Sequence, residues 1–157
     1  MLQYHAPVTN ALTLQIRRLP SAEGLGLPVY MTPGAAGMDL HAAVSEDVLI
    51  HPGDILLIPT GLEVAIPAGF EGQVRPRSGL AVKHGISLPN TPATIDSDYR
   101  GEIRVPLINL GRAAFRISRG MRIAQFVVAP VARVTWAEVD GLPTSQRGGG
   151  GFGHSGV

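Results

Sequence analysis

The sequence contains no cysteine, few charged residues and no long hydrophobic run. Without cysteine, neither a disulfide framework nor a thiolate metal site is possible. Charged residues make up 16% of the chain and the formal net charge is +1, so a basic stripe typical of nucleic-acid-binding proteins is missing. No stretch approaches the roughly 18 apolar residues of a membrane span, and the first residues do not resemble a signal peptide. We therefore expect a cytoplasmic protein with neither nucleic acid nor a membrane as a partner.

Helical periodicity is also nearly absent, and a period of two takes its place. Apolar and polar residues alternate over residues 12–16, 62–66 and 103–107, and turn sequences such as HPGD (51–54) and PAG (67–69) separate such runs. One short helix is expected after Ser78, a candidate N-cap, with Gly85 as its end. Pro106, inside a predicted strand, indicates an edge or an irregular pairing there. A chain of 157 residues with this pattern predicts one all-β domain, a sandwich or a barrel.

The end of the chain is the one low-complexity segment. Six glycines fall between residues 148 and 156, and glycine loses more backbone freedom on ordering than any other residue. We therefore assign residues 1–146 to the β-domain and residues 147–157 to a flexible C-terminal segment.

Two turns contain residues suited to binding an anion or a cation. In AAGMDL (35–40), Asp39 follows a glycine at a predicted strand start, where aspartate is also common as a plain turn residue. In RPRSGLAVKHG (75–85), two arginines lie on one strand face before a helix that opens with Ser78. This second pattern fits either an anion site or a capped helix with surface arginines.

Two further stretches offer candidate catalytic groups. In NTPATIDSDYRGE (90–102), Asp96 and Asp98 fit a cation site, a general base beside a structural carboxylate, or a solvated turn. In RGMRIAQF (119–126), Gln125 is interpreted as a polar side chain that points inward from a buried strand. The five histidines show no metal-ligand spacing.

Five of these segments occur in an order that resembles a known family. AGMDL, PRSGLA, TIDSDYRGE, RIAQ and RGGGGFGHSG, between residues 36 and 156, are similar to the five motifs of the trimeric dUTPase family, the dUTP nucleotidohydrolases. The resemblance implies a jelly-roll-like β-barrel with one short helix, in a homotrimer whose active sites lie at subunit interfaces. It also implies hydrolysis of dUTP to dUMP and pyrophosphate by Mg²⁺-assisted attack of water at the α-phosphorus. That reaction keeps uracil out of DNA and supplies dUMP for dTMP synthesis.

The resemblance further implies roles for individual residues. Asp96 corresponds to the carboxylate that deprotonates the attacking water, Asp39 to the acid that orients Mg²⁺-bound water, and Gln125 to a phosphate contact. Tyr99 corresponds to the ring packed beneath the deoxyribose. No side chain is expected to bind Mg²⁺ directly. The other implied substrate-binding residues are Arg77, Ser78 and Gly79 for the phosphates, Asn90, Thr94, Ile95 and Asp96 for uracil with Arg104 beside them, and Arg147, Phe152 and Gly153 in the tail, which would close as a lid.

One residue departs from the family's pattern, and two other functions stay open. Ala93 stands where the family usually has glycine; if that backbone needs a positive φ, alanine costs about 1 kcal/mol or more and alters the nucleobase fit. The first alternative is a dCTP deaminase-type relative with the same barrel. The second is a non-catalytic trimeric β-sandwich that keeps a nucleotide pocket.

Overall fold

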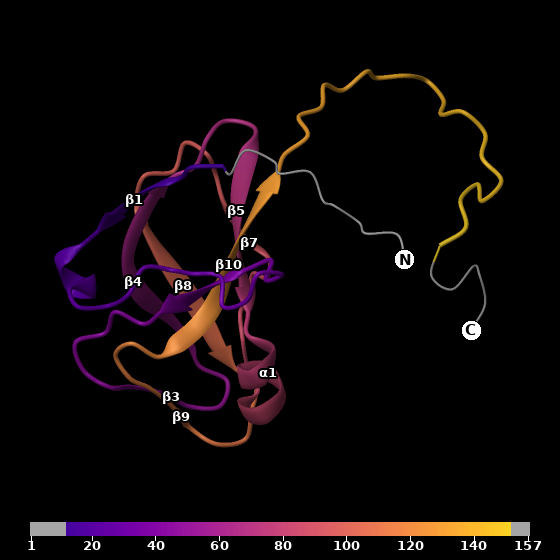
Figure 1. Cartoon of the computed structure of the whole chain (residues 1–157). Coiled ribbons are helices and arrows are strands. Elements are labelled where there is room, and N and C mark those ends of the chain that lie inside the picture. The colour runs from indigo at the N-terminus through magenta and orange to yellow at the C-terminus, as the bar shows by residue number, and fades with distance from the viewer. Residues whose placement is uncertain (1–11, 152–157) are drawn as a thin grey trace, which may run out of the picture.

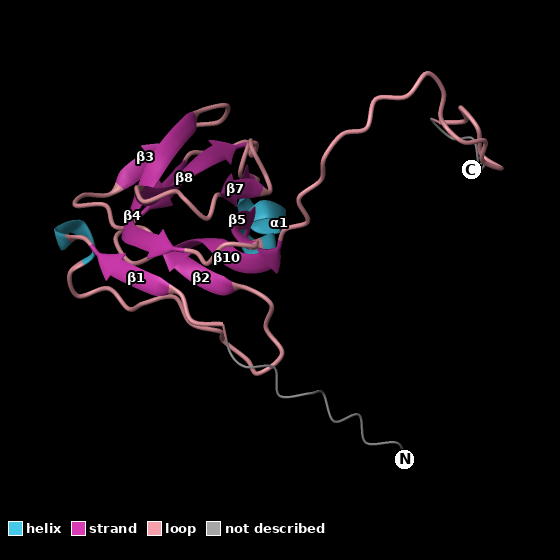
Figure 2. Cartoon of the chain, turned by 90° about the horizontal axis from the view of Figure 1, so that it is seen from above, coloured by secondary structure: helices cyan, strands magenta, loops and turns pink. Residues whose placement is uncertain are grey.

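A computed structural model describes residues 12–151, and ten strands and one α-helix lie in that range. The first four-stranded sheet has the order β1 (Gln15–Arg18), β4 (Ile55–Ala65), β8 (Glu102–Asn109) and β6 (Ile86–Ser87). The second has the order β2 (Met38–His41), β10 (Arg122–Pro130), β5 (Phe70–Pro76) and β7 (Ala93–Ile95). A small third sheet pairs β3 (Val48–Ile50) with β9 (Phe115–Ile117), and all the pairings are antiparallel. The prediction of an all-β fold with one short helix is confirmed (Figures 1 and 2).

The hydrophobic core lies between the two four-stranded sheets. On β8, Ile103, Val105 and Leu107 are buried while Arg104 between them is exposed, which is the alternation that the sequence predicts. Val74 and Phe126 from the second sheet belong to the same buried cluster. Each sheet therefore has one apolar inner face and one outer face, and the outer faces are where polar side chains can form a site.

Pro106 lies where β8 has a strand on one side only. It pairs with Leu57 on β4, whereas β6 pairs with β8 only at Ile108 and Asn109. Proline has no N–H to donate, so it fits a position whose other side has no strand. The expectation of an edge at Pro106 is confirmed.

The helix α1 (Ser78–His84) begins one position earlier than the sequence indicates. The N–H groups of Leu80 and Ala81 both donate to the carbonyl oxygen of Arg77, so Arg77 is the N-cap and Ser78 is the first helical residue. The prediction of Ser78 as N-cap is therefore wrong. Gly85 ends the helix as predicted, with a left-handed φ of 71° that glycine adopts without a steric penalty.

Ala93 begins strand β7 and pairs with Val74 on β5. The backbone of a strand is extended, with negative φ. Alanine therefore carries no left-handed strain here, and its side chain is buried against the core.

After β10 the chain leaves the barrel. Residues 131–151, which we call the arm, contain no strand and no helix, and they run outward from the end of β10 (Figures 1 and 2). The last strand thus ends at Pro130, well before residue 146, where the domain boundary was expected; that boundary stays a prediction. None of the helices in residues 12–151 is long and apolar enough to cross a membrane.

Candidate nucleotide-binding site

A row of polar side chains crosses the outer face of the second sheet. Gln125 on β10 lies directly opposite Asp39 on β2 and Arg75 on β5. Its neighbours Ala124 and Phe126 are buried on the inner face, whereas Gln125 is only half-buried. The prediction that Gln125 points inward is therefore wrong, and its amide lies on the outer face beside Asp39.

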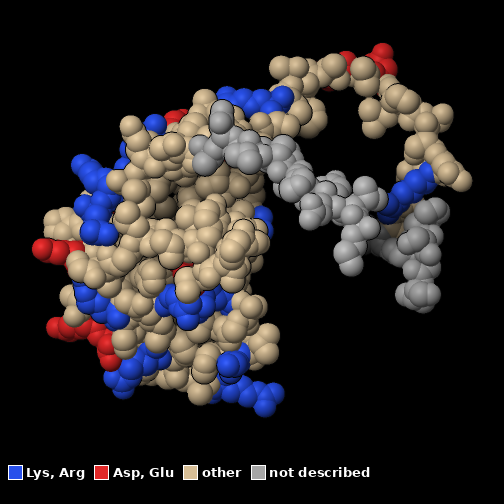
Figure 3. Space-filling model, in the orientation of Figure 1, with Lys and Arg blue, Asp and Glu red and all other residues tan. Residues whose placement is uncertain are grey.

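Asp39 is the buried centre of an ion cluster whose two arginines are partly exposed. Its side chain is 6% exposed, its Oδ1 accepts a hydrogen bond from Arg77 Nε at 2.9 Å, and its Oδ2 accepts one from Arg122 Nη1 at 3.2 Å. Arg122 opens the RIAQ segment, but the sequence did not single it out, because its contact with Asp39 spans 83 positions. On the face of the protein that Figure 3 shows, the Lys and Arg side chains form several separate clusters, and a smaller number of Asp and Glu side chains lie among them and at the edge.

A second group of predicted residues surrounds a cavity between β7 and β8. Thr94, Ile95, Asp96, Tyr99 and Arg104 line it, and its volume is about 290 Å³. Leu57 and Glu102 complete the lining, and neither was singled out from the sequence. The structure thus brings five of the predicted substrate-binding residues together.

The position of the Tyr99 ring in this cavity depends on one hydrogen bond and on the small size of Gly101. Its hydroxyl donates a hydrogen bond to the carbonyl oxygen of Glu102 at 2.9 Å. A Cβ on Gly101 would lie 2.5 Å from the Tyr99 hydroxyl oxygen, so a larger residue at position 101 would displace the ring from this position. The ring is 42% exposed, so a ligand can reach it.

Asp96 lies at the rim that this cavity shares with a neighbouring hollow of about 380 Å³. Glu71, Asp98 and Arg133 contribute to that hollow. The Asp96 carbonyl oxygen accepts the Tyr99 N–H at 3.1 Å, which closes the turn between β7 and β8, and the Asp96 side chain is exposed. A carboxylate at an accessible rim is placed to accept a proton from a bound water.

The remaining predicted residues do not join this cavity in one chain. Ser78 and Gly79 are exposed at the start of α1, Asn90 is exposed in the turn before β7, and the Asp39 cluster is not part of the cavity lining. Arg147 lies in the arm, where its Nε donates to the Gly150 carbonyl oxygen at 2.7 Å. Phe152 and Gly153 lie outside the described residues.

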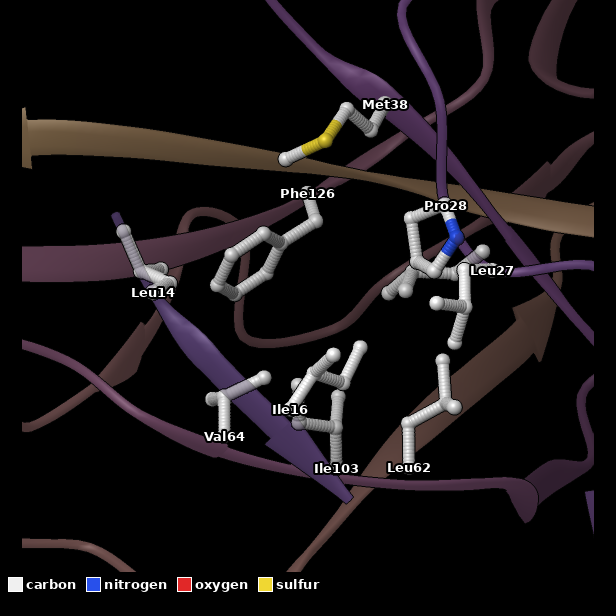
Figure 4. A pocket seen from close by; sticks show the side chains of 10 residues that line it. Leu14, Ile16, Leu27, Pro28, Met38, Leu62, Val64, Ile103 and Phe126 are labelled. Atoms are coloured by element: carbon white, nitrogen blue, oxygen red, sulfur yellow. The ribbon is translucent and has the colours of Figure 1, made fainter. Parts of the chain in front are cut away.

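A further cavity of the barrel, lined by apolar residues, lies elsewhere. It measures about 170 Å³ and only apolar residues line it, among them Leu14, Met38, Val64 and Phe126, whose side chains point into one space (Figure 4). A nucleotide needs polar partners that fix its orientation. The side chains that line this cavity offer none, and none of the predicted site residues is among them.

The described side chains do not form a cage for a metal ion. Within residues 12–151, no three His, Cys, Asp or Glu side chains group as metal ligands. Both carboxylate oxygens of Asp39 already accept arginine N–H groups. Mg²⁺ at this site would therefore depend on oxygen atoms of a bound triphosphate and on water, a ligand set that Mg²⁺ accepts.

Known proteins match this chain along nearly its whole length. The family model described as dUTPase matches residues 25–156. The deoxyuridine 5'-triphosphate nucleotidohydrolase of Rhizobium meliloti (strain 1021) is 57% identical over 158 residues, 98% of this chain and 99% of the relative. That of Thermoanaerobacter sp. (strain X514) is 53% identical over 147 residues, 94% of this chain and 99% of the relative. The dUTPase of Staphylococcus bacteriophage 80alpha, solved with dUPNHPP, superposes with a TM-score of 0.84 at 27% identity and covers 94% of this chain and 100% of its own. The chain therefore belongs to the dUTPase family.

Proposed function

We propose that this protein hydrolyses dUTP to dUMP and pyrophosphate by attack of water on the α-phosphorus. The observation that carries the proposal is the cavity in which Thr94, Ile95, Asp96 and Tyr99 meet, in a chain of the dUTPase family. In the cytoplasm this reaction keeps uracil out of DNA and supplies dUMP for dTMP synthesis.

The edge of β7 supports recognition of uracil. β7 is the last strand of its sheet and, within residues 12–151, pairs with β5 alone, so main-chain groups of Thr94 and Ile95 that point away from β5 are accessible to a ligand. Uracil presents one N–H between two carbonyl oxygens, a pattern that main-chain N–H and C=O groups can match. Asn90, in the turn before β7, adds a side-chain amide. Tyr99 stands below the sugar, and its fixed ring leaves no room for a 2′-hydroxyl.

Asp96 supplies the general base, since its carboxylate is exposed at the rim of the cavity. Arg77, Ser78, Gly79 and Gln125 bind the phosphates. Arg104 lines the cavity beside the nucleoside. From the arm and beyond, Arg147, Phe152 and Gly153 close over the substrate as a lid. Mg²⁺ bound to the triphosphate oxygens and water would neutralise part of the triphosphate charge.

A homotrimer would complete the site. In one chain the Asp39 cluster does not line the cavity that contains Asp96, so another copy has to bring the two groups together. The outer face of the first sheet is apolar where Ile55 pairs with Ile108 and Leu57 with Pro106, and Ile55 and Leu57 are 55% and 51% exposed. Leu57 also lines the cavity, so a subunit contact on this face would reach the site. Trp136 in the arm, 94% exposed, is a second apolar group that another copy would cover.

One assay tests the proposed function and separates it from the alternatives. Pyrophosphate release is measured with each of the four common deoxynucleoside triphosphates, with UTP and with dUTP. We expect release from dUTP at a rate far above the others, and a mass in solution near three times 16.5 kDa. Ammonia from dCTP would instead indicate a deaminase. A trimer that binds dUTP without releasing pyrophosphate would indicate a non-catalytic nucleotide-binding protein.

A further inference from the structure

The segment that contains the nucleoside-binding residues has a single buried side chain. Within residues 89–102, Ala93 alone is buried, with 8% of its surface exposed, and the other residues are exposed or half-buried. Thr94, Asp96 and Tyr99, which line the proposed nucleoside cavity, belong to the exposed group. The position of this segment relative to the core therefore depends strongly on Ala93.

Ala93 packs on the inner face of the second sheet. It lies opposite Val74 on β5, which is 1% exposed, and both residues belong to the core cluster. Thr94 is exposed, and Ile95, half-buried, lies opposite Gly72, which has no side chain to meet it. Because cross-strand side-chain pairs stabilise a sheet, the methyl group of Ala93 is the main side-chain contact between β7 and β5 on this face.

β7 has little else to hold it in place. It is three residues long and, within residues 12–151, pairs with β5 alone. Ala93 itself lines neither the nucleoside cavity nor the neighbouring hollow, whereas Thr94, the next residue, lines both. Short segments with few buried contacts open locally at low free energy. Ala93 can thus affect a ligand only through the position of the strand that follows it.

We propose that Ala93 is a positioning residue that fixes the edge of β7 and thereby sets how strictly the site selects uracil. The inference rests on the proposed function, because it concerns the recognition of the base in that same site. Main-chain groups of Thr94 and Ile95 match uracil only while the edge of β7 keeps its place. When the edge moves, the space beside the base changes, and thymine, which carries one additional methyl group, is rejected less strictly.

The first test measures the anchor without a substrate. Ala93→Gly removes the buried methyl group and adds backbone freedom, so the amide hydrogens of residues 93–95 should exchange with solvent about 5- to 10-fold faster than in the wild type. The control is Ala22→Gly, since Ala22 is 1% exposed and lines neither the cavity nor the hollow. Both variants should melt at a lower temperature, but Ala22→Gly should leave exchange in β7 unchanged.

The second test measures selection of the base in the full-length protein. The ratio of kcat/KM for dUTP to kcat/KM for dTTP should fall about 10-fold in Ala93→Gly, because discrimination of one methyl group depends on a pocket of fixed shape. A loss of folded protein lowers both rates equally and leaves this ratio unchanged. Deoxyuridine should bind about 3- to 10-fold more weakly to Ala93→Gly, and pyrophosphate, which carries no base, should bind as before.

Ala93→Ser separates position from stability. Serine keeps the Cβ that packs on the core, but its buried hydroxyl group lowers the melting temperature. The ratio for dUTP over dTTP should therefore stay close to that of the wild type, even where the protein melts earlier than Ala93→Gly does. A ratio that follows the melting temperature across the glycine and serine variants would overturn the positioning role.

The outcomes for the inference and for the proposed function are distinct. A wild-type ratio or wild-type exchange rates in Ala93→Gly would overturn the inference and leave the proposed function intact. The same loss of ratio in Ala22→Gly would also overturn it, since any weakening of the core would then be sufficient. A wild-type protein that releases no pyrophosphate from dUTP would overturn the proposed function, and amide exchange and deoxyuridine binding would still test the anchor.

Discussion

The barrel buries its large apolar side chains, whereas the arm exposes its own. Leu107 on β8 is completely buried among side chains of both sheets, whereas Trp136 and Leu142 in the arm are 94% and 86% exposed. Burial of a large apolar side chain contributes about 1.5–3 kcal/mol relative to exposure. Burial of apolar side chains within one subunit thus stabilises the barrel. The apolar side chains of the arm would gain this free energy only by packing against another surface. The proposed trimer supplies such a surface.

The largest expected effect is a loss of catalytic rate on substitution of a residue of the barrel. Asp96→Asn should lower kcat for dUTP about 10²–10⁴-fold, because an amide cannot accept the proton of the attacking water. The melting temperature should stay unchanged, since Asp96 is exposed. Steady-state kinetics and thermal unfolding check both parts. Normal turnover in this variant would move the base elsewhere, with Asp98 the next candidate.

A core substitution tests the barrel as the unit of stability. Leu107→Ala should lower the free energy of unfolding by about 2–5 kcal/mol, because a cavity remains among residues that cannot fully collapse. Leu110→Ala is the matched control: Leu110 follows the same strand but is 67% exposed, so its loss should change stability by about 0.5 kcal/mol or less. Chemical denaturation measures both. Equal costs would show that the side chain of Leu110 is covered in the assembled protein.

Deletion of residues 147–157 tests whether the far end of the arm and the residues beyond it contribute to activity. We expect kcat/KM for dUTP to fall about 10²-fold, through loss of the Arg147 charge and of base stacking by Phe152. Residues 147–151 contribute nothing to the described core, so the melting temperature should hardly move. Arg147→Gln alone should lose less than the deletion. Wild-type kcat/KM in the truncated protein would reduce the tail to a flexible end.

Trp136 gives a direct view of what covers the arm, because it is the only tryptophan of the protein. In the assembled trimer its fluorescence should be that of a buried indole, and it should shift to that of an exposed indole when dilution or denaturant separates the subunits. Trp136→Ala should weaken assembly by about 1.5–3 kcal/mol per covered side chain, measured by sedimentation over a range of concentrations. Emission of an exposed indole at all concentrations would mean that the arm stays uncovered.

The smallest expected effect lies at the edge of the barrel, where Arg17 on β1 faces Glu63 on β4. The hydrogen bond from Arg17 holds the pKa of Glu63 below its usual value. The pair therefore stabilises the fold above the pKa of unfolded Glu63, and this contribution disappears as the pH falls through the lowered folded pKa. Glu63→Gln should reduce the melting temperature only slightly at neutral pH and not at all in acid, because exposed pairs contribute little. A large loss at neutral pH would contradict this view of the edge.

Strand β8 could be predicted from the sequence because burial on one face imposes a period of two, whereas in the alternating run 12–16 the strand begins only at Gln15 and all four residues of β1 are exposed. Residues 103–107 show this pattern, and β8 follows it residue by residue. The start of α1 was misplaced by one residue, since a serine beside a helix is a common cap and the actual acceptor is the Arg77 main chain. The residue types at such a boundary do not show which main-chain hydrogen bonds form there.

Candidate site residues can be named from the sequence, and their roles stay predictions, but the contacts between their side chains cannot be predicted from it. Gln125 was placed on the wrong face because a register shift between Arg122 and Ala124 leaves both Ile123 and Ala124 buried, and the simple alternation breaks there. The contact of Arg122 with Asp39 depends on β10 pairing with β2, two strands far apart in sequence. Sheet order of this kind is a property of the whole fold, so no local pattern contains it.

The free edge of β7 has a consequence for how this family can change over time. In the proposed complex the base is read by main-chain groups of residues 94–96, which every amino acid except proline carries in the same form. Most substitutions of Thr94 or Ile95 would thus alter the surroundings of the contact without altering the contact. Specificity for the base is then robust to drift in sequence, and an inhibitor that copies uracil's hydrogen bonds would meet few single substitutions that remove its partners.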